Sequence, residues 1–444
     1  MAEELDASAS RRARLASLLP AGSLGRSVSV LAGGAAVAQG LTLVSSVLIN
    51  RLYSPASFGQ YGAASSLVAL VTTIGSLKYD LAIPLPGDEK VAANLVALSV
   101  FVLAGLAATS ALLLIVAGGS ILHLFNAQAL MPYAWLLLVA QLGGCVYNVF
   151  LSFAIRQKQF QTIARTRITQ AVANVGTQIA IGLVSASPAG LMAGETMGLT
   201  AGSGRLGRDA WRVSSVAIKQ VSFAGIRAVA HRYRKFAILS SPAALLNAIG
   251  YYSPLLLVVA LYGARTGGLF ALGQRLIQAP VVLLTMSISQ VFVAEAAVLA
   301  REDPPALRAL FSRTIRRLAM LGTPVVLVLA VAAPLLTGPV FGSRWEQAGI
   351  YVTILAPFFL CQLAASPLGG TLDVLERQDL HLIREIARVT ITSGAVVAAS
   401  ALNLSAEQAI AVLSAAGSVA YILYGLISWY AIVQAGDRDD RLVN

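Results

Sequence analysis

The stretch Arg205–Lys235 reads RLGRDAWRVSSVAIKQVSFAGIRAVAHRYRK and is the longest polar connection in the chain. Apolar segments lie on both sides of it, six before and six after. We place them at 28–50, 60–83, 92–118, 130–154, 168–186, 189–204, 236–262, 267–294, 318–341, 348–374, 389–402 and 406–434. A membrane-spanning helix needs about 20 apolar residues, so these segments predict an all-α integral membrane protein with twelve transmembrane helices. The expected organisation is a tail at 1–27, a six-helix bundle at 28–204, the basic connection at 205–235, a second six-helix bundle at 236–434 and a tail at 435–444.

The composition supports a membrane protein. Hydrophobic residues make up 57% of the chain, charged residues only 12%, and the mean hydropathy is +0.76. A soluble domain has roughly 25% charged residues. The net charge of +12 does not indicate nucleic-acid binding, because the cations lie in loops on one side, where they face anionic membrane lipids.

The positive charges are sorted between the two sets of loops. All but five of the 32 Lys and Arg lie on the side that carries both termini and the 205–235 connection. The exceptions are Arg51, Arg265 and Arg344 on the other side, and Lys78 and Arg275 inside predicted spans. Short loops rich in Lys and Arg stay in the cytoplasm. Both termini are therefore expected to be cytoplasmic, and Val213–Arg232 is expected to lie as a helix on the inner membrane surface.

The two halves repeat a sequence pattern. LYSPASFGQY at 52–61 joins the first two spans of one half, and LYGARTGGLF at 261–270 joins the first two spans of the other. Leu52, Tyr53 and Gly59 match Leu261, Tyr262 and Gly268 at a constant offset. Repeats of six spans share one orientation about an axis along the membrane normal. We expect two bundles that rock about a site between them.

Polar side chains inside the spans lie on single helix faces. Span five carries Gln170, Asn174 and Gln178, with Arg167 at its inner end, and this stripe favours a water-filled cavity. Interhelical hydrogen bonding is the alternative for such residues. Two further sets are Asn247 with Tyr251 in span seven, and Arg275 with Gln278 in span eight.

Charged residues inside spans indicate a functional site more strongly than polar residues do, because a Lys or Arg at a helix centre costs about 2.5–3.5 kcal/mol of insertion free energy. Lys78 and Arg275 either snorkel to a membrane surface or face a cavity. Asp80 and Glu195 are candidates for coupling transport to H⁺ or Na⁺, and Glu195 is equally a candidate partner for a cation.

No enzyme signature is present. His123, His231 and His381 are dispersed, and the sequence has no HExxH, Walker or glycine-rich phosphate motif. Cys145 and Cys361 are far apart and have no metal-ligand spacing. We expect neither a metal nor a cofactor.

Several motifs in order resemble the Wzx-type polysaccharide flippases of the multidrug/oligosaccharidyl-lipid/polysaccharide exporter superfamily. They are PASFGQY at 55–61, KYDLAIP at 78–84, RQKQF at 156–160, YRKF with SSP at 233–242, and GLFALGQR with SISQVF at 268–292. The resemblance covers most of 28–400. It implies a multidrug-and-toxin-extrusion-like fold, in which two six-helix bundles form a V.

The resemblance also implies a cargo, an undecaprenyl-diphosphate-linked oligosaccharide. It would be flipped from the inner to the outer leaflet of a bacterial inner membrane for surface polysaccharides such as lipopolysaccharide or exopolysaccharide. A polysaccharide polymerase or glycosyltransferase would be a further partner.

A diphosphate favours arginine and other cations, which points to Arg275 and Lys78, together with Arg156, Arg167 and Arg388 near the inner surface. Sugars favour amides, hydroxyls and aromatic faces. The residues of this kind are Gln170, Asn174, Gln178, Asn247, Tyr251 and Gln278.

Two other functions remain open. A cation-coupled multidrug exporter of the same fold would use Asp80 or Glu195. A membrane-embedded glycosyl-transferring enzyme is the second alternative, although short outer loops argue against it.

Overall fold

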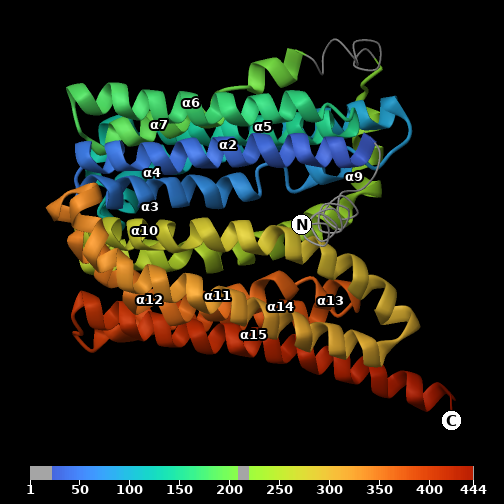
Figure 1. Ribbon diagram of the computed structural model, residues 1–444. Helices are drawn as coiled ribbons and strands as arrows, with labels where there is room; N and C mark the ends of the chain where they lie inside the picture. Colours follow the sequence, from blue (N-terminus) through green and yellow to red (C-terminus); the bar gives the residue numbers. More distant parts are fainter. Residues whose placement is uncertain (1–22, 209–219, 444) are drawn as a thin grey trace, which may run out of the picture.

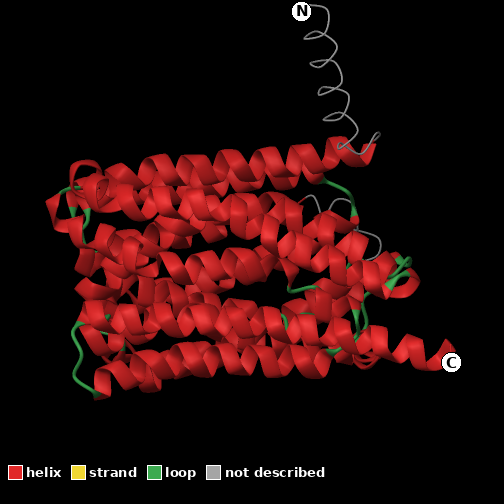
Figure 2. Cartoon of the chain, turned by 60° about the horizontal axis from the view of Figure 1, so that its bottom comes forward, coloured by secondary structure: helices red, strands yellow, loops and turns green. Residues whose placement is uncertain are grey.

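The computed structural model describes residues 23–208 and 220–443, and these residues are almost entirely helical, without a strand (Figures 1 and 2). The helices form two bundles, one that precedes α9 (Phe223–Arg232) in the chain and one that follows it. The first contains α2 (Ser23–Leu52), α3 (Pro55–Thr73), α4 (Glu89–Leu124), α5 (Ala134–Arg156), α6 (Phe160–Val184) and α7 (Pro188–Thr200). The second contains α10 (Ser241–Glu302), α11 (Pro304–Phe341), α12 (Glu346–Ala365), α14 (Gln378–Ala401) and α15 (Ala406–Val443), with the short α13 (Thr371–Val374) before α14. Figure 1 shows them as an upper, blue-to-green group and a lower, yellow-to-red group.

Seven segments within the described residues are long and apolar enough to cross a membrane. They are Val30–Leu52, Glu89–Leu124, Gln128–Arg156, Phe236–Gln278, Pro305–Phe341, Ser343–Val374 and Ala406–Ala435. The helices α3, α6, α7 and α14 fall outside this set because they are short or carry more polar residues. The protein is therefore an all-helical, multi-pass membrane protein.

Helix α10 consists of two limbs. The chain turns at Gly263, where φ is +85° and ψ is 163°, inside the predicted connection between 262 and 267. A positive φ of this size is easily reached only by glycine. The turn brings the two limbs alongside each other, so that a Cβ on Gly267 would lie 2.1 Å from a Val259 methyl group.

Two expected spans have different bounds in the structure. Span two is expected to be helical to residue 83, but the helix ends at Thr73. After it, Leu77 and Lys78 adopt left-handed backbone conformations, with φ values of 49° and 61°. The Ser76 hydroxyl donates to Asp80 in this segment, and such local side-chain bonds compete with helical ones. Lys78 is therefore not an intrahelical cation.

Span eleven, expected at 389–402, begins much earlier, because α14 starts at Gln378. Its first half contains Arg384, Glu385 and Arg388, which lie before the expected start of this span. The structure buries all three, with 3%, 2% and 7% of their surface exposed.

The bundles meet through the two repeated segments. A Cβ on Gly59 of α3 would lie 1.7 Å from the carbonyl oxygen of Ala264, and a Cβ on Gly268 of α10 would lie 1.8 Å from that of Pro55. Gly59 and Gly268 are the residues that match in the sequence repeat. Backbones can approach this closely only where neither residue has a side chain.

Hydrogen bonds across the bundles lie at the same end. Trp345 Nε1 donates to the Asn50 carbonyl over 2.7 Å. Arg51 donates from Nε to the Val340 carbonyl (2.9 Å) and from Nη2 to the Pro339 carbonyl (2.8 Å). Those two carbonyls end α11, where helical carbonyls lack partners. The end of the molecule that carries the α2–α3 loop is therefore closed.

Candidate functional site

The folded-back α10 brings two of the expected binding residues into contact. Tyr251 lies on its first limb and Gln278 on its second, and the Tyr251 hydroxyl donates to Gln278 Oε1 over 2.8 Å. Tyr251 is 46% exposed, and its ring packs edge-on against Tyr252 at 4.9 Å between centroids. Asn247, one turn earlier than Tyr251, is also exposed.

Arg275 connects the two bundles. Its Nη2 donates to the carbonyl oxygen of Thr42 on α2, over 3.2 Å. No carboxylate of the described residues lies within ion-pair distance of Arg275. The guanidinium faces protein in the direction of α2, and its charge is not cancelled by a direct partner.

Glu195 on α7 and Arg275 both lie near the side chain of Tyr61. Glu195 Oε1 accepts a 2.7 Å hydrogen bond from the Ser65 hydroxyl of α3, and its Oε2 is buried without a partner in the described structure. The Tyr61 side chain lies near enough to both Glu195 and Arg275 to feel the charge of each. A carboxyl group with one unsatisfied, buried oxygen is well placed to bind a proton or a cation.

The α14 charges combine Arg388, which the sequence analysis named as a candidate, with Arg384 and Glu385, which it did not single out. Arg388 donates to Glu385 Oε2 from Nη2 (2.6 Å) and from Nε (3.1 Å), and Arg384 Nη2 lies 3.5 Å from Glu385 Oε1. Arg384 also stacks on the Tyr424 ring at 3.7 Å from its centroid. The three charges sum to one positive charge inside the second bundle.

Backbone carbonyls complete this network. Arg388 Nη2 donates to the Asn247 carbonyl over 3.2 Å, and Arg384 Nη1 donates to the Gly369 carbonyl over 3.1 Å. The signal in the sequence was the pair of arginines four residues apart, with an acid between them, because this spacing places the arginines on one helix face. The neutralising glutamate makes it tolerable to bury them.

A small cavity of about 20 Å³ joins these groups. Its walls come from α10, α12, α14 and α15, and its polar lining residues are Tyr251, Gln274, Gln278, Gln362, Arg388 and Tyr421. Gln362 Nε2 donates to the Tyr421 hydroxyl over 3.0 Å, whereas Gln362 Oε1 is buried without a partner. A cavity of this volume holds about one water molecule, and the amides, hydroxyls and guanidinium around it can both donate and accept hydrogen bonds.

The span-five stripe faces a different way from the one expected. Gln178 is 6% exposed and donates to the Leu191 carbonyl of α7 over 3.2 Å. A Cβ on Gly194 of α7 would meet Gln178, and one on Gly198 would meet Asn174 and the Gln170 carbonyl. The stripe therefore lies against α7 inside the first bundle, so the expected water-filled cavity is wrong for this face. The glycines of α7 let the amides approach closely, and the sequence alone did not show which neighbour they would meet.

The remaining candidates are not part of the α10 cluster. Asp80 is 8% exposed and accepts from Ser76, while Lys78 is half-buried beside it in the same turn. Arg156 donates to the carbonyls of Pro86 and Gly87 in the loop before α4. Arg167 is exposed on α6. The described residues contain no group of His, Cys, Asp and Glu that could hold a metal ion.

Residues 48–349 match a family model described as "Polysaccharide biosynthesis protein". This match covers more than half of the sequence. The chain belongs to the polysaccharide biosynthesis protein family. No curated protein matches it.

Solved structures show which fold this polysaccharide biosynthesis protein has. It is similar to the lipid II flippase MurJ in an inward closed conformation, with 14% identity over 91% of this chain and 89% of that one, and a TM-score of 0.64. It is also similar to an inward-facing multidrug resistance MATE family transporter of the MOP superfamily, with 13% identity, 91% and 95% coverage and a TM-score of 0.57. A MOP superfamily transporter from Pyrococcus furiosus gives 13% identity, 92% and 95% coverage and a TM-score of 0.54. The fold is thus that of the MATE and MurJ transporters, as the sequence motifs implied.

Proposed function

We propose that this protein flips a polyprenyl-diphosphate-linked oligosaccharide from the inner to the outer leaflet of a bacterial inner membrane, by alternating access. The observation that carries the proposal is the cluster on α10. Arg275, Gln278 and Tyr251 lie where the two bundles face each other, next to an end that is closed by direct packing. Membership of a polysaccharide biosynthesis family and the likeness to a flippase fold support this cargo class.

The topology proposed with it has twelve transmembrane helices and both termini in the cytoplasm. The cation asymmetry between loops supports this orientation. It places the closed end, with Arg51 and Arg344, at the outer surface. The described conformation would then receive cargo from the inside.

Arg275 is the residue proposed to bind the diphosphate. Among the described residues it has no carboxylate partner, in contrast to Arg384 and Arg388, whose charges are partly cancelled by Glu385. A guanidinium can donate to two phosphate oxygens at once. Asn247, Tyr251 and Gln278 would bind sugar hydroxyls, and Lys78, Arg156 and Arg167 would attract the anionic cargo before it reaches Arg275.

Export of surface glycan by cells that depend on this protein tests the assignment of Arg275. Arg275→Ala should abolish export at unchanged protein level, and Arg275→Lys should restore only part of it, because lysine cannot form the two-pronged contact. Arg265→Ala is the matched control, since Arg265 lies on the same helix and is exposed. Full export by Arg275→Ala would remove this residue from the binding site.

We propose Glu195 as the coupling group, because its side chain lies beside Ser65 and Tyr61 and its buried Oε2 makes no hydrogen bond of ordinary geometry within the described residues. Glu195→Gln keeps an oxygen that can accept from Ser65 but cannot bind and release a proton. Transport by this variant in proteoliposomes should no longer depend on a pH gradient. A gradient dependence equal to that of the wild type would leave Glu195 as a structural partner of Ser65.

A cation-coupled multidrug exporter is the second candidate, favoured by the MATE neighbours and by the same Glu195. Native mass spectrometry of the purified protein separates the two functions. A co-purifying lipid with a diphosphate and sugars supports the flippase. Drug resistance conferred by the protein, without any such lipid, supports the exporter.

A further inference from the structure

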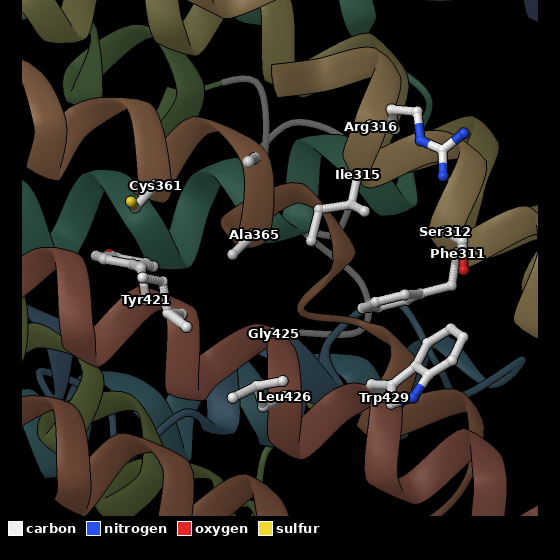
Figure 3. Close-up of a pocket in the computed structure, with 12 residues that line it drawn as sticks. Phe311, Ser312, Ile315, Arg316, Cys361, Ala365, Tyr421, Gly425, Leu426 and Trp429 are labelled. Atoms are coloured by element: carbon white, nitrogen blue, oxygen red, sulfur yellow. The ribbon is translucent and has the colours of Figure 1, made fainter. Parts of the chain in front are cut away.

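A second cavity lies on the other side of the α12–α15 pair, between α11, α12 and α15. Its volume is about 470 Å³, within the range of roughly 300–1,000 Å³ that is typical of ligand pockets. Figure 3 shows its wall as mostly apolar, with Phe311, Ile315, Cys361, Leu426 and Trp429. Leu426 and Ile422 are 55% and 53% exposed, so the cavity is an open groove on the flank of the second bundle.

Positive charge gathers at one end of this groove. Figure 3 shows Arg316 and Ser312 at the end where Phe311 and Trp429 lie, opposite Cys361 and Tyr421. Helix α11 carries Arg308, Arg313, Arg316 and Arg317 in its first four turns and has no acidic residue. Among the described residues, none of these arginines makes an ion pair.

Arg308 adds a second cation to the arginine end. Its guanidinium carbon lies 6.0 Å from the centre of the Trp429 ring, and Trp429 lines the groove. Arg308 Nε is buried and has no partner within the described structure. An unsatisfied donor beside an exposed arginine is a place where an anionic oxygen would be stabilised.

We infer that this groove binds one anionic phospholipid of the leaflet next to the arginines, with a hydrocarbon chain along the apolar wall and its phosphate at Arg316 and Arg308. The charge distribution favours this occupant, because a zwitterionic headgroup would bring a cation of its own next to the two arginines, whereas an anionic headgroup brings only its phosphate. The site is separate from the α10 cluster, and it does not depend on which cargo the protein carries.

The groove and the polar cavity share one wall residue. Tyr421 lines both, and its hydroxyl accepts from Gln362 inside the polar cavity. A chain lying in the groove would pack behind the Tyr421 ring. Occupation of the groove should therefore restrict the movement of a residue that lines the polar cavity.

Gly425→Leu tests the groove directly. A Cβ at Gly425 would meet only the Ile315 Cδ1 atom at 3.7 Å, an ordinary contact, so the added side chain can extend into the groove without disturbing the backbone. Gly394→Leu is the matched control, because Gly394 is exposed on α14 and has nothing within 4 Å of its Cβ position. Arg316→Gln removes the charge and leaves the groove open.

Binding of phosphatidylglycerol and phosphatidylcholine to the detergent-purified protein would be measured by native mass spectrometry. The wild type should bind phosphatidylglycerol about 25-fold more tightly, since each of two cations near a membrane surface contributes about fivefold. Gly425→Leu should weaken binding of both lipids, Arg316→Gln should reduce the preference about fivefold, and Gly394→Leu should change neither. If Gly425→Leu does not give a monodisperse protein, Arg308→Gln together with Arg316→Gln provides the test.

Two outcomes would overturn the inference. Equal affinities for the two lipids in the wild type would mean that the arginines do not select an anionic headgroup. Displacement of phosphatidylglycerol by a polyprenyl phosphate from the wild type, with weaker binding of that compound to Gly425→Leu, would assign the groove to the cargo chain instead. Neither result would bear on the assignment of Arg275.

Discussion

The contact between Gly59 and Gly268 gives a direct way to open the closed end. Gly268→Ala would place a methyl group 1.8 Å from the Pro55 carbonyl oxygen and 3.0 Å from the Gly59 amide nitrogen, both backbone atoms of the other bundle. Real Cβ contacts are essentially never shorter than 3.0 Å. The two backbones must therefore separate by at least about 1.2 Å for the methyl group to fit.

The steric clash introduced by Gly268→Ala raises the free energy of the closed state only. Overpacking a tight contact typically costs about 1–3 kcal/mol, which corresponds to a change of roughly 5- to 150-fold in a two-state equilibrium. A state with the outer ends apart has no such clash. Gly268→Ala should shift the population towards that state by about this factor, and export should fall because the outer end no longer closes.

Spin labels at Ala129 and Arg265 report the change as a distance distribution. Both positions are exposed, and Asn126 near the first donates to the Val259 carbonyl, at the same end of the second bundle, over 2.9 Å. Gly394→Ala is the control, because it gains the same helix propensity of about 1 kcal/mol without any contact. An unchanged distribution in Gly268→Ala, with a correctly folded protein, would refute the argument that this contact holds the end closed.

Three further predictions follow from described contacts. Arg51→Ala removes both hydrogen bonds to the end of α11 and should lengthen the same label distance by a smaller shift, worth about 1 kcal/mol or less at an exposed site; a distance distribution equal to that of the labelled Gly394→Ala protein would exclude a role in closure. Glu385→Gln leaves two buried arginines without their carboxylate partner and should destabilise the protein by about 3–5 kcal/mol, measured as a lower melting temperature. The control Glu376→Gln changes an exposed residue and should leave the melting temperature unchanged. Equal melting temperatures for the two variants would contradict the ion network. A cysteine at the exposed Ala129 should react with a membrane-impermeant reagent in intact cells and one at Ser214, which lies outside the described residues, should not; labelling of Ser214 from outside would overturn the proposed topology.

The sequence predicted the features that depend on local pattern. The repeated glycine segments and the connection that contains Gly263 follow from spacing that can be read in the chain, whereas the contact between Tyr251 and Gln278 comes from the structure. The structure adds that Gly59 and Gly268 contact each other, which the repeat made understandable but did not itself show.

Other features depended on neighbours that the sequence does not name. Arg384 and Arg388 looked like loop residues because their charge is visible and their partners, Glu385, Tyr424 and two backbone carbonyls, are not recognisable as partners without the fold. The amide stripe of α6 had the right periodicity for a single face, but periodicity does not say whether that face meets water or the glycines of α7.

The buried charges of α14 also bear on how the chain enters a membrane during synthesis. An isolated helix with Arg384 and Arg388 would insert poorly, since each arginine costs about 2.5–3.5 kcal/mol near the bilayer centre. The groups that offset this cost include Asn247 of α10, which is made before α14, and Tyr424 of α15, which is made after it. We therefore expect helix α14 to reach its final depth only once α15 has left the ribosome, so that the two helices enter the bilayer together as a hairpin against α10. Helix α15 would then be required for the biogenesis of α14.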